Sequence, residues 1–168
     1  MIEFLKIIFT KPIELLKWLT NHHPGQLFPT PSTRKDIQRI PIDDNSYLEV
    51  FWKILEFGTG PAVSLFINKE EILRIDCSGP GTGHLHAAFF LPWEGEVRLF
   101  LPEKTCSLQI ERAVFEITHN WNYYHSRVAN ASVRSVRLNV NKIEDAAKIA
   151  GQKMHVLLDT VPELKEKT

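Results

Sequence analysis

The chain has few cysteines, no excess of charge of either sign and no long apolar run. Its two cysteines, Cys77 and Cys106, are too few for a disulfide framework and lack the spacing of a zinc site. Lys plus Arg is 20 and Asp plus Glu is 20, so the basic excess typical of nucleic-acid binding is missing. No stretch approaches the ~20 apolar residues of a membrane-spanning helix. We therefore expect two reduced thiols and no nucleic-acid partner.

The first residues also lack the features of a secretory signal. Glu3, Lys6, Lys11 and Pro12 interrupt the apolar stretch, and no small-residue cleavage site follows. We therefore expect a cytoplasmic protein. The 168 residues are 43% apolar and 24% charged, which is close to the average of globular domains. A chain of this length suits one domain and can fold without disulfides.

Residues 1–25 are predicted to form an apolar helical arm. Large apolar side chains recur at helical spacing between residues 2 and 20, and Pro24-Gly25 ends the pattern. Such a face must be buried on the protein's own core, a second copy, a partner or a membrane surface. We expect a protein partner or self-association through this arm, with peripheral membrane contact by residues 2–20 as an alternative.

The next segment, residues 26–45, is predicted to be a linker or strap, because Pro29, Pro31 and Pro41 stand among turn-forming residues. Residues 46–168 are predicted to be the core domain. Apolar–polar alternation and short turns predict five antiparallel strands between residues 47 and 101. Apolar residues three or four apart predict helices at about 105–128 and 142–158, and alternation predicts a strand at about 133–140. This order is typical of an α+β fold, a mostly antiparallel sheet with helices packed on one face.

The best candidate for chemistry is the pair of segments around the glycine-rich loop. Arg74 and Asp76 share one face of a strand, and His84 and His86 share one face of the next. A hairpin across the loop would bring all four to one side of the sheet. Two imidazoles and a carboxylate are a ligand set for zinc or iron. Alternatively, Asp76 orients a histidine that acts as a general base, or the four residues simply form a solvated polar face.

Other reactive side chains have a simpler structural interpretation. Cys77 alternates away from Asp76, and Cys106 begins the apolar stripe of a helix, so we expect both thiols in the core rather than a cysteine nucleophile. Glu116 and His119 are spaced like metal ligands of helical bundles. No second pair of this kind is present in the sequence, so we expect a solvated helix face there.

Residues 74–77 and 84–86 also carry a resemblance to a family. An Arg-x-Asp-Cys strand, a short loop, a His-x-His strand and a C-terminal helix resemble small uncharacterised bacterial domains, over roughly residues 47–155. The resemblance implies no activity. The His-x-His segment also resembles the first half of the cupin motif, but Phe90 and its neighbours stand where cupins have a glutamate.

Two functions of different classes follow from these features. The first is a non-catalytic protein-interaction module that docks through its apolar arm. The alternative is a metal-binding protein or His-dependent enzyme that uses Asp76, His84 and His86.

Overall fold

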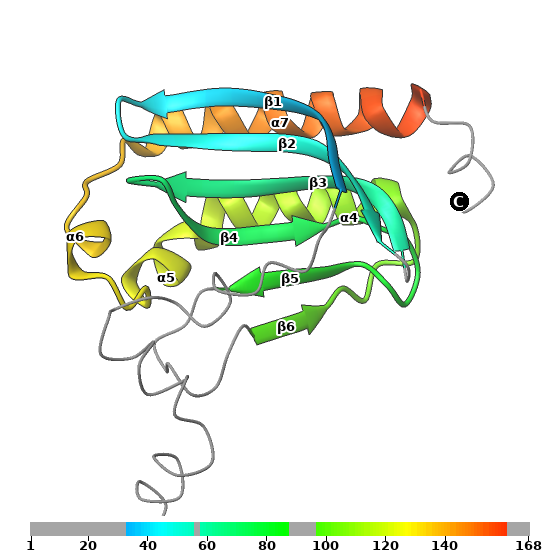
Figure 1. Ribbon diagram of the computed structural model, residues 1–168, viewed down its shortest axis with the longest axis horizontal. Coiled ribbons are helices and arrows are strands. Elements are labelled where there is room, and N and C mark those ends of the chain that lie inside the picture. Colours follow the sequence, from blue (N-terminus) through cyan, green and yellow to red (C-terminus); the bar gives the residue numbers. More distant parts are fainter. Residues whose placement is uncertain (1–32, 56–57, 88–96, 161–168) are drawn as a thin grey trace, which may run out of the picture.

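The computed structural model describes residues 33–55, 58–87 and 97–160 (Figure 1). The predicted arm over residues 1–25 lies outside them, as do the docking and membrane contacts expected of it. None of the helices in the described ranges is long and apolar enough to cross a membrane.

Six strands of the described residues form an antiparallel sheet in which each strand pairs with the next along the chain (Figure 1). Connections of a few residues join the first four strands, which explains their antiparallel pairing. In chain order they are β1 (Thr33–Asp43), β2 (Ser46–Leu55), β3 (Gly58–Ile67), β4 (Glu70–Asp76), β5 (His84–Ala87) and β6 (Val97–Phe100).

The helices follow the sheet in the sequence. They are α4 (Cys106–Phe115), the π-helical turn η1 (Glu116–Asn120), α5 (Trp121–Ser126), α6 (Ala131–Arg134) and α7 (Val140–Thr160). The first three are continuous, which confirms the helix predicted at about 105–128. Thr105 caps α4, because its side chain accepts a hydrogen bond from the Leu108 amide at 3.2 Å. The second predicted helix is confirmed by α7.

Residues 33–43 form a strand where the composition predicted a linker or strap. Ile40 and Ile42 of β1 are buried in the core. The pairing of β1 with β2 shifts register between Lys35 and Gln38, and Asp36 lies in the left-handed region with φ 53°. This bulge takes up the irregularity of the segment while the strand continues at the edge of the sheet.

The strand predicted at about 133–140 is absent, and α6 and an irregular connection occupy this segment. Its apolar alternation has a different origin, because Val136 and Leu138 pack against the core from the connection. Asn139 then caps α7, since its side chain accepts a hydrogen bond from the Lys142 amide at 3.3 Å.

One face of the sheet packs against α4 and α7 to make the hydrophobic core (Figure 1). Leu48, Val50 and Trp52 of β2 alternate into this core. Gly151 lies where α7 approaches α4 closely, since a Cβ there would be 2.7 Å from Val114 Cγ2. The glycine therefore permits close packing and does not end the helix. The predicted α+β class, an antiparallel sheet with helices on one face, is confirmed.

The opposite face of the sheet carries a group of buried polar and charged residues, with Phe51 beside them. Glu49, Lys53, Asp76 and His86 are 5%, 5%, 2% and 3% exposed. The solvated sheet face that we considered from the sequence is therefore wrong. Buried charges are costly unless they are paired, so the partners of these groups determine what this face can do.

Candidate metal centre

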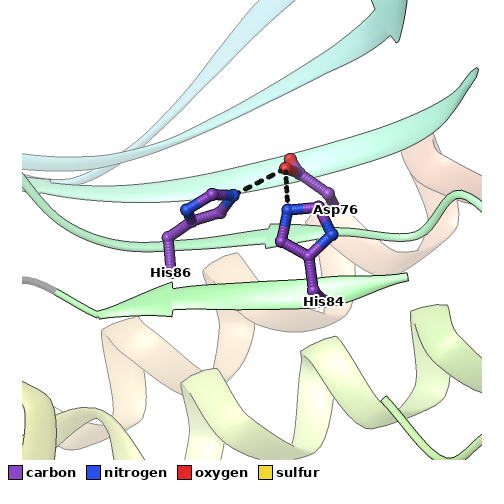
Figure 2. A group of neighbouring side chains, drawn as sticks. All are labelled: Asp76, His84 and His86. Atoms are coloured by element: carbon purple, nitrogen blue, oxygen red, sulfur yellow. Dashed lines mark hydrogen bonds and ion pairs between the residues drawn. The ribbon is translucent and has the colours of Figure 1, made fainter. Parts of the chain in front are cut away.

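Asp76, His84 and His86 lie together on the polar face of β4 and β5 (Figure 2). Asp76 is the cross-strand partner of His84, and Arg74 is the partner of His86. Asp76 Oδ2 is 3.1 Å from His86 Nε2 and 3.4 Å from His84 Nε2. The potential ligand atoms of the three residues are all within 4.8 Å of one another. The predicted proximity is thus observed, and it arises from the antiparallel register of two short strands.

Lys53 is a fourth member of the cluster, and it comes from β2. Its Nζ donates a hydrogen bond to Asp76 Oδ2 at 2.5 Å. Strand β3 lies between β2 and β4, which places these two strands about 9.6 Å apart. Lys53 crosses this gap with its long side chain.

Small residues on β3 make the crossing possible. Gly60 is the cross-strand partner of Lys53, and Ala62 is the partner of Asp76. Gly60 is required for a second reason, because a Cβ at this position would lie 2.2 Å from the Cys77 carbonyl oxygen. The small side chains of β3 thus leave space for the side chain of Lys53 to pass over β3 and reach Asp76.

Arg74 connects the cluster to a chain of ion pairs across the polar face. Its Nε is 3.5 Å from Asp76 Oδ1, and its Nη1 donates to Glu71 at 2.9 Å. Glu71 also accepts a hydrogen bond from Arg34, which contacts Glu49 in turn. The prediction that Arg74 and Asp76 point together is confirmed.

These charges perturb the protonation of the cluster. Burial opposes ionisation of Asp76, but the His86 hydrogen bond and the charges of Arg74 and Lys53 outweigh it and lower the pKa of Asp76 well below its usual value. Burial lowers the pKa of Lys53, and the attraction of Asp76 only partly offsets this. Burial likewise lowers the pKa of His84. The cluster therefore has a strong anion at its centre and a histidine that favours its neutral form.

The glycine-rich loop between β4 and β5 orients His84. His84 Nδ1 donates to the Thr82 carbonyl oxygen at 2.7 Å, which leaves Nε2 facing Asp76. The loop is itself held by Gln109 of α4, a fully buried side chain. Gln109 accepts a hydrogen bond from the Gly79 amide and donates one to the Gly79 carbonyl, both at 2.9 Å. The core helix therefore fixes the loop, and the loop fixes the imidazole.

Lys53, Thr82 and Gln109 were not identified from the sequence. Lys53 carried a usable signal, because it alternates onto the same sheet face as Glu49 and its strand is followed by a glycine turn. The contribution of Thr82 is a backbone carbonyl, which no side-chain pattern reveals. Gln109 lies on the buried stripe of a helix, where a polar residue indicates a partner but does not identify it.

The remaining candidates lie apart from this cluster. Cys77 and Cys106 are fully buried members of the core, as predicted, and burial raises the pKa of the Cys77 thiol well above its usual value. His119 is exposed and stacks on Phe115. The solvated helix face expected here is observed at His119 and Tyr123, but Glu116 is 2% exposed and is an exception to it.

Comparisons of the chain with protein-family models, curated proteins and solved structures find no match. No function is therefore carried over from a relative, and the chemistry of the cluster has to be argued from its own geometry.

Proposed function

We propose that the protein binds one divalent transition-metal ion, zinc or ferrous iron, through Asp76 Oδ2, His84 Nε2 and His86 Nε2. Two histidines and one carboxylate are an established ligand set for both ions. All three side chains are buried or nearly so, and two short paired strands hold them in register.

The two separations from Asp76 Oδ2 suit a common central ion. Two ligands about 2.1 Å from a tetrahedral zinc ion are about 3.4 Å apart, and two at right angles around an octahedral ion are about 3.0 Å apart. The observed separations from Asp76 Oδ2 are 3.4 Å to His84 and 3.1 Å to His86. The third separation, between the two histidines, is bounded only by 4.8 Å, so metal binding requires the two rings to approach each other. It also requires His86 Nε2 to release the proton that it donates to Asp76 Oδ2.

The orientation of His84 is the observation that carries the proposal. Its Nδ1 hydrogen is donated to the Thr82 carbonyl, so in the neutral ring Nε2 bears a lone pair. That lone pair faces a carboxylate oxygen of Asp76, and two acceptors at 3.4 Å need a positive centre between them. Burial disfavours protonation of His84 as that centre. A metal ion meets the requirement, and the hydrogen bond to Thr82 is the type of second contact that orients metal-binding histidines.

Lys53 supplies positive charge to Asp76 in the described structure. Its ammonium group contacts the same oxygen that we assign to the metal. A carboxylate oxygen has two lone-pair sites, so one atom can bind a metal and still accept from Lys53. Because two positive groups would then share one oxygen, we expect Lys53 to weaken metal binding while it stabilises the metal-free fold.

Three protein ligands are typical of catalytic rather than structural metal sites, because they leave a coordination position for water or substrate. Among the described residues, no fourth side chain joins the ligand group. The alternative is a metal-free mechanism in which Asp76, 3.1 Å from His86 Nε2, orients this histidine as a general base.

Metal analysis of the purified full-length protein tests the proposal. We expect a stoichiometric ion, or saturable binding of added zinc or ferrous iron after treatment with a chelator. His84→Asn and His86→Asn should abolish the binding and the rise in melting temperature that the metal causes. His119→Asn is the matched control, because His119 is exposed, lies in η1 and is not part of the ligand group.

Absence of metal from the purified protein, together with no binding of either added ion, would refute the proposal. Unchanged affinity in both histidine variants would show that any bound metal occupies another site. Circular dichroism spectra of the variants distinguish lost ligands from a lost fold.

A further inference from the structure

A second concave site lies on the other face of β5. Leu85 alternates with His84 and His86 and therefore points away from the metal centre, toward the helices. There it lines a cleft of about 400 Å³ between the β5–β6 edge and the segment formed by α4, η1 and α5. This volume is within the ~300–1,000 Å³ range of small-molecule sites.

The sheet side of the cleft is apolar. Leu85, Leu99 and Leu101 line it together with Phe100 and Pro102. Leu99 is 49% exposed, and Leu85 is its cross-strand partner on the same face. The ring of Phe100 lies on the other face, 5.8 Å from the His84 ring. Exposed apolar side chains that gather beside a cleft indicate a surface suited to an apolar ligand.

On the helix side, the cleft is lined by a polar cluster centred on Glu116. This carboxylate is 2% exposed and accepts hydrogen bonds from Asn120 Nδ2 at 2.8 Å and Tyr124 Oη at 2.7 Å. Arg112 Nη2 lies 2.8 Å from its other oxygen. Glu116 is therefore occupied by three donors, and its role is to hold them in place.

The cluster coincides with the π-helical turn η1, which begins at Glu116 and ends at Asn120. A π turn within an α-helix is rare and occurs frequently at functional sites, because the wider turn changes which side chains share a face. Here Arg112 precedes the turn and Tyr124 follows it, and both contact Glu116.

Arg112 is the group available to a ligand. Its side chain is 42% exposed and lines the cleft, and one of its guanidinium nitrogens is held by Glu116. The guanidinium group has five N–H donors in a planar arrangement that matches a carboxylate. Among the described residues that line the cleft, only Arg112 and Glu116 are charged, and Glu116 is buried behind its donors.

We propose that this cleft binds a small carboxylic acid with an apolar chain or ring, with its carboxylate on Arg112 and its apolar part against Leu85 and Leu99, which are cross-strand partners on the same face of the sheet. Leu85 and Leu99 face the cleft from the side of the sheet opposite His84 and His86, whereas the ring of Phe100 lies beside the metal centre, 5.8 Å from the His84 ring.

Calorimetric titration of the full-length protein with sodium octanoate tests the assignment, with 1-octanol as the neutral ligand of equal chain length. We expect saturable binding of one octanoate per chain and clearly weaker binding of octanol. Arg112→Gln should weaken octanoate binding about tenfold, because a hydrogen-bonded charge pair is lost. Arg137→Gln, the same change at an exposed arginine outside the cleft, should have no effect.

Leu99→Ser tests the apolar wall without touching the arginine, and it should weaken octanoate and octanol alike. Addition of a chelator should leave octanoate binding unchanged, which separates this site from the metal centre. Absence of saturable octanoate binding would overturn the proposal. Equal affinity for octanoate and octanol, with no loss in Arg112→Gln, would overturn the assignment of a carboxylate ligand.

Discussion

Replacing Lys53 with methionine should destabilise the metal-free protein and strengthen its binding of metal. Methionine keeps the length of the side chain and removes the charge. Lys53 is 5% exposed and Asp76 is 2% exposed, so the substitution leaves a buried carboxylate without its closest cation. Breaking a buried pair in this way costs about 3–5 kcal/mol. We expect about 3 kcal/mol, because Arg74 and His86 still contact the carboxylate.

A double-mutant cycle isolates the interaction between the two side chains. Asp76→Asn alone should also destabilise the protein, because it leaves the buried ammonium of Lys53 without its anion. The double variant removes both charges, so its loss of stability should be smaller than the sum of the single losses by at least about 1 kcal/mol. Such coupling is expected only if the 2.5 Å contact between Lys53 and Asp76 forms in solution.

Urea denaturation in the presence of a chelator measures these stabilities, and repetition with zinc measures the metal-dependent part. Lys53→Met should gain more stability from zinc than the wild type does. Lys35→Met is the matched control, because Lys35 is an exposed lysine of β1, and its loss should change stability by less than about 0.5 kcal/mol. Additive losses in the cycle, or a weaker response to zinc in Lys53→Met, would refute this account of the polar face.

Three further predictions concern the packing around the two sites. Gly60→Ala should lower stability by about 1–3 kcal/mol, because its Cβ would meet the Cys77 carbonyl oxygen; an unchanged melting temperature would contradict the close approach. Gln109→Leu removes the acceptor of the buried Gly79 amide, so it should cost about 1–3 kcal/mol in urea denaturation and reduce zinc affinity in calorimetry. Burial and the hydrogen bond to Glu116 raise the pKa of Tyr124. Above about pH 10 the unfolded state therefore loses a phenol proton that the folded state keeps. The free energy of unfolding should consequently fall as the pH rises past that value. Tyr124→Phe should show a shallower fall in urea denaturation at pH 9–11, and equal slopes would contradict the raised pKa.

The fold was predictable wherever one periodicity dominated the sequence. The stripe of α4 to α5 and that of α7 are buried along one face, and both helices form as expected. The prediction of secondary structure failed where local composition or apolar spacing was typical of a different element from the one that forms. Three prolines suggested a linker, yet Ile40 and Ile42 anchor β1 in the core. Val136 and Leu138 alternate like strand residues, but they pack on the core from an irregular connection.

The candidate site was predictable only in part, because the sequence defines which residues share a strand face but not what lies over that face. The i, i+2 spacing and the short loop were sufficient to bring Asp76, His84 and His86 together. Burial of the polar face was not predictable from alternation, since polar residues at every second position are typical of an exposed sheet surface. The contribution of Lys53 depends on β3 lying between its strand and β4, which is a property of the topology.

Stability of the fold alone does not explain why this face of the sheet carries so many charged residues. Four cations, Arg34, Arg39, Lys53 and Arg74, alternate with three carboxylates, those of Glu49, Glu71 and Asp76. Apolar residues of similar volume usually stabilise a fold as well as a buried ion network or better. The opposite face of the same sheet shows that this chain can build an apolar layer. The charges are therefore best explained by what they do to Asp76, because they keep a buried carboxylate ionised beside two imidazoles, and an ionised carboxylate is the form that a metal ion requires.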